Sequence, residues 1–360
     1  MKKLVISSYL FLMVFGCLSV LWAQSTNPIM IGQSQLEPGG YLHYRYNYTK
    51  EGDTNVDNPD TLDVLRARLF LDGRITPDVT GRIEYDLRSS TLLDLYVKIS
   101  HLPYTDWLVT VGQFKTPFSF AGEILGTPLQ ETVKGPLIYE PLTPTPMSTF
   151  SDREIGIMAK GEMLNKKAEY TLGIFNGNGI NTTDDNDIKD RLIQFRMLPW
   201  KDDARSPLKP MMIGASWLLG EVTEYDVVSG TMVSRGINTR ERYSYTLRYE
   251  IEKTMVTYEY FRQTLDVDGT ENINSKAWYV QLSRDEKVDL FNKKQSVRPV
   301  FRYEFYDPDN TQDNNEVRMT TYGFNWQINR ALRLQVNYNN VSDDLDTREN
   351  ETLIQLEIKF

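Results

Sequence analysis

The feature that most constrains the fold is an alternation of apolar and polar side chains that repeats along nearly the whole chain. Successive side chains of a β-strand point to opposite faces, so such a segment has one apolar and one polar face. The chain ends on this pattern, because LIQLEIKF places Ile354, Leu356, Ile358 and Phe360 on one face. Alternation also occurs at 42–48, 65–71, 83–87, 93–99, 107–111, 170–174, 193–197, 213–219, 243–249, 256–260, 301–305, 322–328 and 332–338, and more weakly at 153–161 and 275–284. We therefore predict an all-β protein with about sixteen antiparallel strands.

The N-terminus has the pattern of a secretory signal peptide. Lys2 and Lys3 precede an apolar run, Leu4–Trp22, and Ala23 offers a cleavage site. An uncleaved membrane anchor is the alternative. The predicted divisions of the chain are a signal peptide at 1–23, a short N-terminal segment at 24–39 and a single β-domain at 40–360.

Composition leaves two classes of exported β-protein. The chain is acidic, with a formal net charge of −9, so a nucleic-acid partner is not expected. The one cysteine, Cys17, lies in the signal, which argues against a small disulfide-stapled domain. Beyond the signal, no apolar run approaches the roughly 20 residues that a spanning helix needs. The two remaining classes are a soluble β-domain and a transmembrane β-barrel whose spanning signal is hidden in the alternation.

The connections between the predicted strands favour the barrel, because short and long ones alternate as in outer-membrane barrels. Short connections are 73–80, 101–106, 162–167, 251–254 and 329–331, and the mostly longer, polar ones are 49–61, 116–152, 177–187, 221–240, 265–274, 307–315 and 343–350. Exceptions are 89–92, which is short on the loop side, and 199–208 and 285–295, which are long on the turn side.

The strand ends also favour a barrel. Aromatic residues at strand ends, such as Tyr48, Trp107 and Tyr249, fit the girdles at the two membrane interfaces. A closed barrel has no edge, so a last strand that ends at Phe360 would pair with the first strand. We predict a transmembrane antiparallel β-barrel in the outer membrane of a Gram-negative bacterium. The alternative is an exported binding or adhesin protein without channel activity, either a soluble sandwich or a barrel with binding loops.

One connection, 116–152, is too long and too rich in proline to be a paired strand. Its apolar residues would let it pack rather than remain solvated; they are Phe118, Phe120, Ile124, Leu125, Leu137, Ile138 and Tyr139. In a barrel the place available for packing is the lumen. We therefore predict a long third loop that constricts the pore.

The run that leads into this loop, VTVGQFKTPFS at 109–119, resembles the phosphate-selective porin O/P family. The strand around 93–97 and the segment RARLFLDG at 66–73 fit the same family. The resemblance covers nearly the whole of 40–360. It implies a sixteen-stranded outer-membrane porin, a homotrimer, with an infolded third loop, and its name implies phosphate as the solute.

Basic residues on the polar parity are the candidate solute-binding groups, because anion pores are lined by Arg and Lys. The pore-lining candidates are Arg66, Arg68, Arg82, Arg88 and Lys98, and the constriction-loop candidates are Lys115, Lys134 and Arg153. By strict alternation Lys115 would face lipid unless its strand has already ended. Two interpretations stay open. The wall charges pair with acidic neighbours, or the cations form a ladder that guides anions.

Catalysis, a metal and a cofactor are not predicted. The only two histidines, His43 and His101, lie on different predicted segments, and the chain has neither a GxSxG nor an HExxH motif. The acidic run at 184–187 lacks the spacing of an EF-hand. The predicted function is passive diffusion of small hydrophilic solutes, including anions such as phosphate, across a membrane whose lipid surrounds the barrel.

Overall fold

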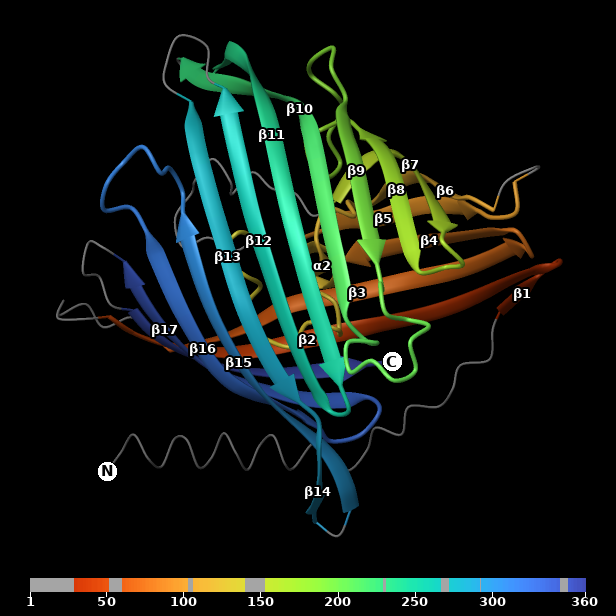
Figure 1. The fold of residues 1–360 in the computed structure, drawn as a ribbon, viewed down its shortest axis with the longest axis vertical. Helices are drawn as coiled ribbons and strands as arrows, with labels where there is room; N and C mark the ends of the chain where they lie inside the picture. Colours follow the sequence, from red (N-terminus) through yellow and green to blue (C-terminus); the bar gives the residue numbers. More distant parts are fainter. Residues whose placement is uncertain are drawn as a thin grey trace.

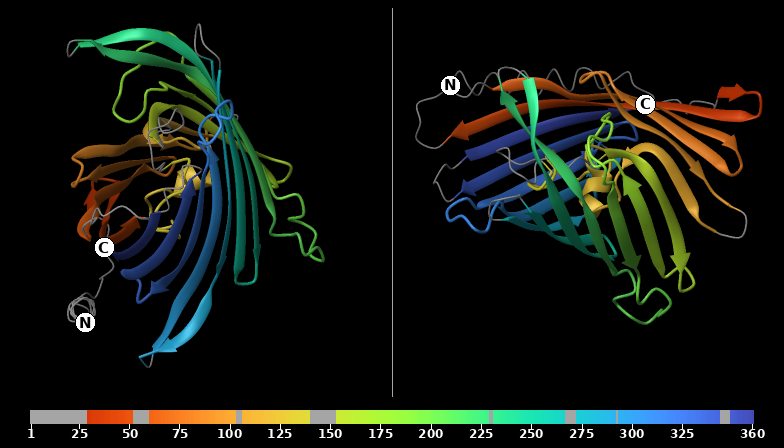
Figure 2. Two further views of the ribbon diagram at one scale, coloured as in Figure 1. Left: turned by 90° about the vertical axis from the view of Figure 1, so that its left-hand side faces the viewer. Right: turned by 90° about the horizontal axis from the view of Figure 1, so that it is seen from above.

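The structure is a computed structural model that describes residues 29–51, 60–102, 106–139, 153–228, 231–266, 272–291, 293–343 and 349–360. These residues form one antiparallel sheet that closes on itself, with a single short helix inside it (Figures 1 and 2). No helix in the described part is long and apolar enough to cross a membrane.

Sixteen strands make the closed wall, as predicted. They are β2 (Ser34–Glu51), β3 (Thr61–Thr76), β4 (Val79–Asp86), β5 (Thr91–Ile99), β6 (Leu108–Lys115), β7 (Arg153–Met163), β8 (Ala168–Phe175), β9 (Asp190–Met197), β10 (Met212–Val228), β11 (Thr231–Ile251), β12 (Thr254–Asp266), β13 (Ile273–Arg284), β15 (Lys293–Asp307), β16 (Val317–Gln327), β17 (Leu332–Asp343) and β18 (Glu349–Lys359). Each strand pairs with its neighbours in the sequence, and β18 pairs with β2 to close the wall.

Two shorter strands extend this wall. The strand β1 (Ile29–Ile31) forms a hairpin with the start of β2, which begins ahead of the predicted boundary at residue 40. The strand β14 (Glu286–Leu290) continues β13 after Asp285 and pairs with the first part of β15. The hairpin of β14 and the first part of β15 projects beyond the turn end of the barrel (Figure 1).

The two faces of the wall differ as the alternation predicts. Leu69, Ile83 and Leu95 are 43%, 48% and 48% exposed on the outer face. Polar side chains such as Gln335, Asn337 and Asn339 are buried on the inner face. An apolar outside and a polar inside are what a barrel in lipid requires.

Two sequence-based boundaries are wrong. The predicted loop at 221–240 is instead the tip of the long β10–β11 hairpin, which projects from the loop end (Figure 2). The predicted turn at 285–295 contains β14. Both segments are polar and lie beyond the membrane-spanning part, where neither face needs apolar side chains, so no apolar alternation marks them as strands.

β-bulges interrupt the alternation, and those in β3 and β5 change the faces that the sequence predicts. In β3 the register shifts so that Leu65 has no partner on β2, and in β5 a shift leaves Leu93 without one on β4. A bulge adds one residue and moves the following side chains to the other face. Leu93, predicted on the same face as Leu95, is consequently buried whereas Leu95 is exposed.

The last residue is part of the closure. The amide of Gly40 donates to the carbonyl of Phe360 at 2.9 Å, and the amide of Phe360 donates back at 3.1 Å. A Cβ on Gly40 would lie 2.6 Å from the Phe360 ring, so the ring packs where Gly40 has no side chain. The terminal strand thus pairs with β2 along its whole length.

Candidate functional site

The third loop, described over 116–139, lies inside the barrel (Figure 1). We call residues 117–139 the luminal loop. Its one regular element is helix α2 (Phe120–Ile124), which Ser119 caps by accepting from the amide of Gly122 at 3.0 Å. A Ser at this position satisfies one of the amides that a helix start leaves free. The predicted residues 140–152 lie outside the described part of the chain.

The first anchor of the luminal loop is Glu259 on β12. Its carboxylate accepts the backbone amides of Phe120 and Ala121 at 2.8 and 2.9 Å. It also accepts the hydroxyls of Thr246 and Tyr279 at 2.8 and 2.7 Å. Glu259 is 0% exposed, so a buried carboxylate with four donors fixes the start of α2 to the wall.

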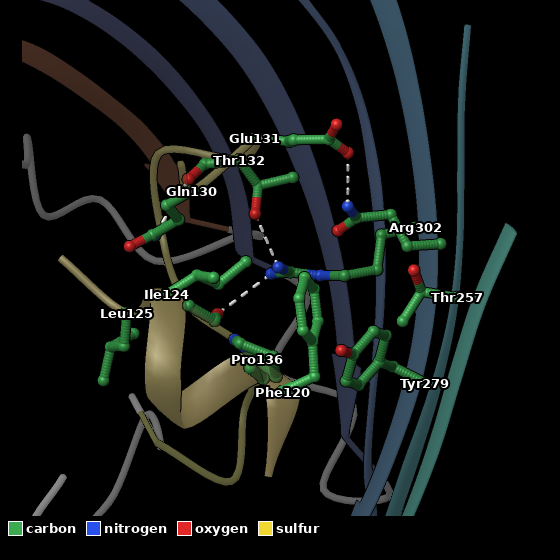
Figure 3. Close-up of a pocket in the computed structure, with 13 residues that line it drawn as sticks. Phe120, Ile124, Leu125, Gln130, Glu131, Thr132, Pro136, Thr257, Tyr279 and Arg302 are labelled. Carbon is green, nitrogen blue, oxygen red and sulfur yellow. Dashed lines mark hydrogen bonds between the residues drawn. The ribbon is translucent and has the colours of Figure 1, made fainter. Parts of the chain in front are cut away.

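The second anchor is Arg302 on β15, which Figure 3 places at the centre of the contact between loop and wall. Its guanidinium donates to the Thr132 hydroxyl at 2.6 Å and to the Gly135 carbonyl at 2.9 Å. Glu304 pairs with Arg302 at 2.9 Å and accepts the amide of Leu137 at 2.7 Å. Arginine and glutamate of one strand therefore hold the second half of the loop.

A third anchor joins the luminal loop to the turn end. The buried carboxylate of Glu131 pairs with Arg298 and accepts from Gln281 at 2.7 Å and Ser283 at 3.2 Å. Arg298 also binds Asp285, which lies outside the wall strands. That hydrogen bond holds the pKa of Asp285 below its ordinary value.

The middle of the luminal loop reaches the opposite side of the barrel. The Gly126 carbonyl accepts from the Tyr41 hydroxyl at 2.9 Å and from Arg68 at 3.1 Å. A Cβ on Gly126 would lie 3.0 Å from Nε of Arg66, and the positive φ of +66° also favours glycine there. Glu123 pairs with Arg196 of β9, so both ends of this stretch are bonded to the wall.

Apolar packing inside the lumen supports these bonds. Phe118, Leu137 and Ile138 are almost fully buried and belong to one cluster with Phe175 and Phe261 of the wall. Burying a large apolar side chain is worth about 1.5–3 kcal/mol. Between α2, residues 130–136 and strands β12–β15 a cavity of about 20 Å³ remains (Figure 3). This volume suits a single water molecule.

Among the described residues, the bonds of the luminal loop are distributed unevenly. Hydrogen bonds and ion pairs join it to β2, β3, β6, β9, β12, β13 and β15–β18. None joins it to β4, β5, β7 or β8 within the part that the structure describes. Between β4 and β8 only β6 bonds to the luminal loop in the described part of the chain, and we call the side of the loop that faces these strands its free edge.

Most of the predicted pore-lining cations have carboxylate partners. Arg68 pairs with Asp86 at 3.1 Å, and Arg82 pairs with Asp72 at 2.9 Å. Glu84 is shared, 2.8 Å from Arg82 and 3.5 Å from Arg68. These contacts fit the interpretation of a charge-paired wall for this part of the ladder.

The other three pore-lining candidates are placed differently. Arg88 is exposed at the loop end and pairs with Asp63 at 3.2 Å. Arg66 is half-buried beside the luminal loop. Lys98 is half-buried with its ammonium 4.9 Å from the ring centroid of Tyr96, and it makes no ion pair with any described residue.

The three constriction-loop candidates are all bonded. Lys134 pairs with Glu351 at 2.8 Å, and Arg153 is buried and pairs with Asp94 at 2.8 Å. Lys115 donates to the carbonyls of Gly122 and Leu125. It does not face lipid as strict alternation implied, because Gly112, with φ of +128°, interrupts the alternation of β6.

Sequence reasoning missed two buried arginines, Arg240 and Arg242 of β11. Arg240 pairs with Asp190 at 2.7 Å, and Arg242 donates to Gln263 at 2.6 Å. Arg240 is the last residue of the predicted loop at 221–240, and Arg242 immediately precedes the predicted strand at 243–249. The sequence does contain a strand pattern here, since Asn238, Arg240 and Arg242 alternate with residues that face outward.

The comparisons with known proteins agree with this architecture. The family model "Phosphate-selective porin O and P" matches residues 240–358, a part of the chain different from the 109–119 stretch that suggested the family. No curated protein matches the chain.

Solved structures of outer-membrane proteins match along almost the whole chain. The trimer form of OmpT from Vibrio cholerae is 13% identical with a TM-score of 0.64, covering 91% of this chain and 99% of its own. The channel DcaP of Acinetobacter baumannii is 14% identical with a TM-score of 0.63, covering 93% and 100%. The anion-selective porin from Comamonas acidovorans is 12% identical with a TM-score of 0.63, covering 91% and 100%. At these identities the likeness concerns the fold. The fold is that of outer-membrane barrels, and the family match to residues 240–358 confirms the resemblance of the chain to the phosphate-selective porin O and P family.

Proposed function

We propose that this porin passes small hydrophilic anions preferentially, along a passage between the free edge of the luminal loop and the wall of β3–β9. The luminal loop narrows the pore by occupying the rest of the cross-section. No chemistry is proposed. His43 is buried against Glu357 at 2.9 Å, and His101 lies at a turn beside Asp78 at 2.9 Å, so neither faces a nucleophile.

The observation that carries the anion preference is the set of cations on this wall. They include Arg66, Arg82, Lys98, Lys160 and Arg196. Acidic partners partly offset them, since Asp72 and Glu84 pair with Arg82, Glu169 pairs with Lys160 at 2.7 Å and Glu123 pairs with Arg196. Lys98 has no such partner among the described residues, so it contributes most to the positive potential of the passage.

The proposal is tested by single-channel recording in a planar bilayer with a salt gradient. We expect a reversal potential on the anion side, and current block by added phosphate if the solute is phosphate. A cation-side reversal potential would contradict the proposal. Anion preference without block would support a general anion channel and exclude phosphate as a bound solute.

Lys98→Glu is expected to lower the anion-to-cation permeability ratio by about tenfold. The change reverses one charge where the local dielectric is lower than in water, which is worth roughly 1–2 kcal/mol. The measurement is the same reversal potential. Lys201→Glu, an exposed charge reversal in the turn at 198–211, is the matched control and should leave the ratio unchanged. If the anion-to-cation permeability ratio is the same in the Lys98 variant and the wild type, Lys98 does not line the passage.

The proposed porin is a homotrimer in the outer membrane. It is exported there with a signal peptide, residues 1–23, that is then cleaved. OmpT of Vibrio cholerae, which shares the fold, occurs in a trimer form. Migration of the unheated protein at three times the monomer mass, and a mature N-terminus at Gln24, are the expected results. A monomer in mild detergent would contradict the trimer.

A further inference from the structure

A row of cations crosses the outer face of the barrel near its loop end. Arg262 of β12 pairs in register with Lys276 of β13, and Arg318 of β16 lies opposite Phe305 of β15. Each cation has a sequence neighbour that is buried on the inner face: Phe261 precedes Arg262, Ala277 follows Lys276, and Met319 follows Arg318. Because successive side chains of a strand alternate between faces, the three cations point outward, from β12, β13 and β16.

An aromatic row lies next to these cations, one step towards the middle of the membrane. Trp278 stacks on Phe305 with ring centroids 6.0 Å apart, and Tyr260 packs against Tyr245 at 6.2 Å. The two rows touch at one point, because Lys276 and Arg318 lie 5.6 and 5.5 Å from the Phe305 ring. Aromatic girdles mark the level of the lipid headgroups, and long loops mark the outer side of the membrane. The cations therefore lie at the headgroups of the outer leaflet.

A polar pocket of about 380 Å³ opens directly above Lys276. It is lined by Lys276, Asp307, Asn310, Gln312, Asp313, Asn314 and Glu316. Asp309 keeps the loop in shape by accepting from the Thr311 hydroxyl at 2.8 Å and the Gln312 amide group at 2.9 Å. Amide and carboxylate groups that line a cavity can both donate to and accept from hydroxyls, as a sugar requires.

The charges of this region are partly paired and partly available. Lys276 pairs with Asp307 at 3.1 Å, and Arg318 pairs with Glu316. Arg262 is exposed and makes no ion pair with any described residue. One oxygen of Asp307, whose side chain is 3% exposed, has no hydrogen-bond partner among the described residues. The site thus offers a cation for a phosphate and an unused acceptor for a hydroxyl.

We propose that this outer surface binds the phosphorylated sugar headgroup of an outer-leaflet glycolipid. Arg262 and Lys276 contact the phosphate, Asn310 and Asp307 contact sugar hydroxyls, and the acyl chains lie along Trp278 and Phe305. A free phosphate would use only the cations, whereas a lipid uses the aromatic row as well, which favours the lipid. The inference rests on the outer-membrane location of the porin but not on its ion preference.

The test uses the full-length porin in mild detergent and three probes, namely lipopolysaccharide, phosphatidylglycerol and inorganic phosphate. The readout is the temperature at which heating shifts the gel mobility of the barrel, as a function of probe concentration. We expect lipopolysaccharide to raise this temperature. The double variant Arg262→Gln/Lys276→Gln should raise the half-effect concentration of lipopolysaccharide by roughly 20–30-fold, at about fivefold per cation. Lys253→Gln/Arg330→Gln is the matched control, with the same charge change at the turn end of the barrel.

The outcomes separate the parts of the proposal. A wild-type response in the Arg262/Lys276 variant would overturn the site. An equal response to phosphatidylglycerol would overturn sugar recognition, and an equal response to inorganic phosphate would overturn the lipid as ligand. Asn310→Ala should raise the half-effect concentration of lipopolysaccharide severalfold without changing the response to phosphatidylglycerol. Conductance of the double variant should equal that of the wild type, so a failed lipid test and a failed channel test remain distinct.

Discussion

Replacing Glu259 with alanine is expected to release the start of the luminal loop and to raise single-channel conductance severalfold. The change leaves the amides of Phe120 and Ala121 and the hydroxyls of Thr246 and Tyr279 without their acceptor. Each unsatisfied buried donor costs about 1–3 kcal/mol, so the docked loop should lose roughly 3–5 kcal/mol. A loop that undocks opens the cross-section it occupied. Conductance and open-channel noise in a planar bilayer measure this.

The matched control is Glu250→Ala, which removes an exposed carboxylate near the turn end that makes no hydrogen bond with a described residue. It should keep the wild-type conductance. A Glu259 variant whose conductance and noise equal those of the wild type would show that the other anchors suffice, and that Glu259 does not set the width of the pore.

Gly112→Val should impair assembly of the barrel more than any other single change on β6. A Cβ at this position would lie 2.2 Å from the Leu95 carbonyl and 2.8 Å from Cα of Tyr96, so the backbone of β5 would have to move. The φ of +128° adds strain for any side chain, most of all a β-branched one. We expect the temperature of the gel-mobility shift to fall by roughly 10 °C, corresponding to about 3 kcal/mol.

Gly236→Val serves as the control, because a Cβ there meets no atom within 4 Å. It should assemble normally. If both variants shift at the same temperature, the close approach of β5 to Gly112 is relieved at little cost, and the glycine is not required by the fold.

Alternation predicted the wall well for a physical reason. Lipid outside and polar groups inside impose one parity rule on every spanning residue, so strand number and closure follow from the sequence. The rule applies only within the membrane, so it predicts loops at the tips of β10–β11 and β14–β15, where the structure has strands. It also fails at bulges such as those at Leu65 and Leu93, because a single inserted residue is decided by local pairing.

The candidate site was less predictable, because the partners of its charged residues depend on which strands lie next to one another. Parity placed Arg68 and Arg82 in the lumen, and the structure shows the acidic partners that make them part of a paired wall. The anchors of the luminal loop depend on residues far away in sequence. Glu259 is 138 residues from Ala121, and Glu304 is 167 residues from Leu137. No local pattern indicates such contacts.

The same separations bear on how the protein is made. The luminal loop is synthesised before most of its partners, because β9, β12, β13 and β15–β18 follow it in the chain, whereas β2, β3 and β6 precede it. Loop docking must therefore come late, after β12, β15 and β17 are in place. Contacts of such large sequence separation slow folding. During insertion the apolar side chains of Phe118, Leu137 and Ile138 remain without their wall partners, and a periplasmic chaperone that shields residues 117–139 would prevent their aggregation in this interval.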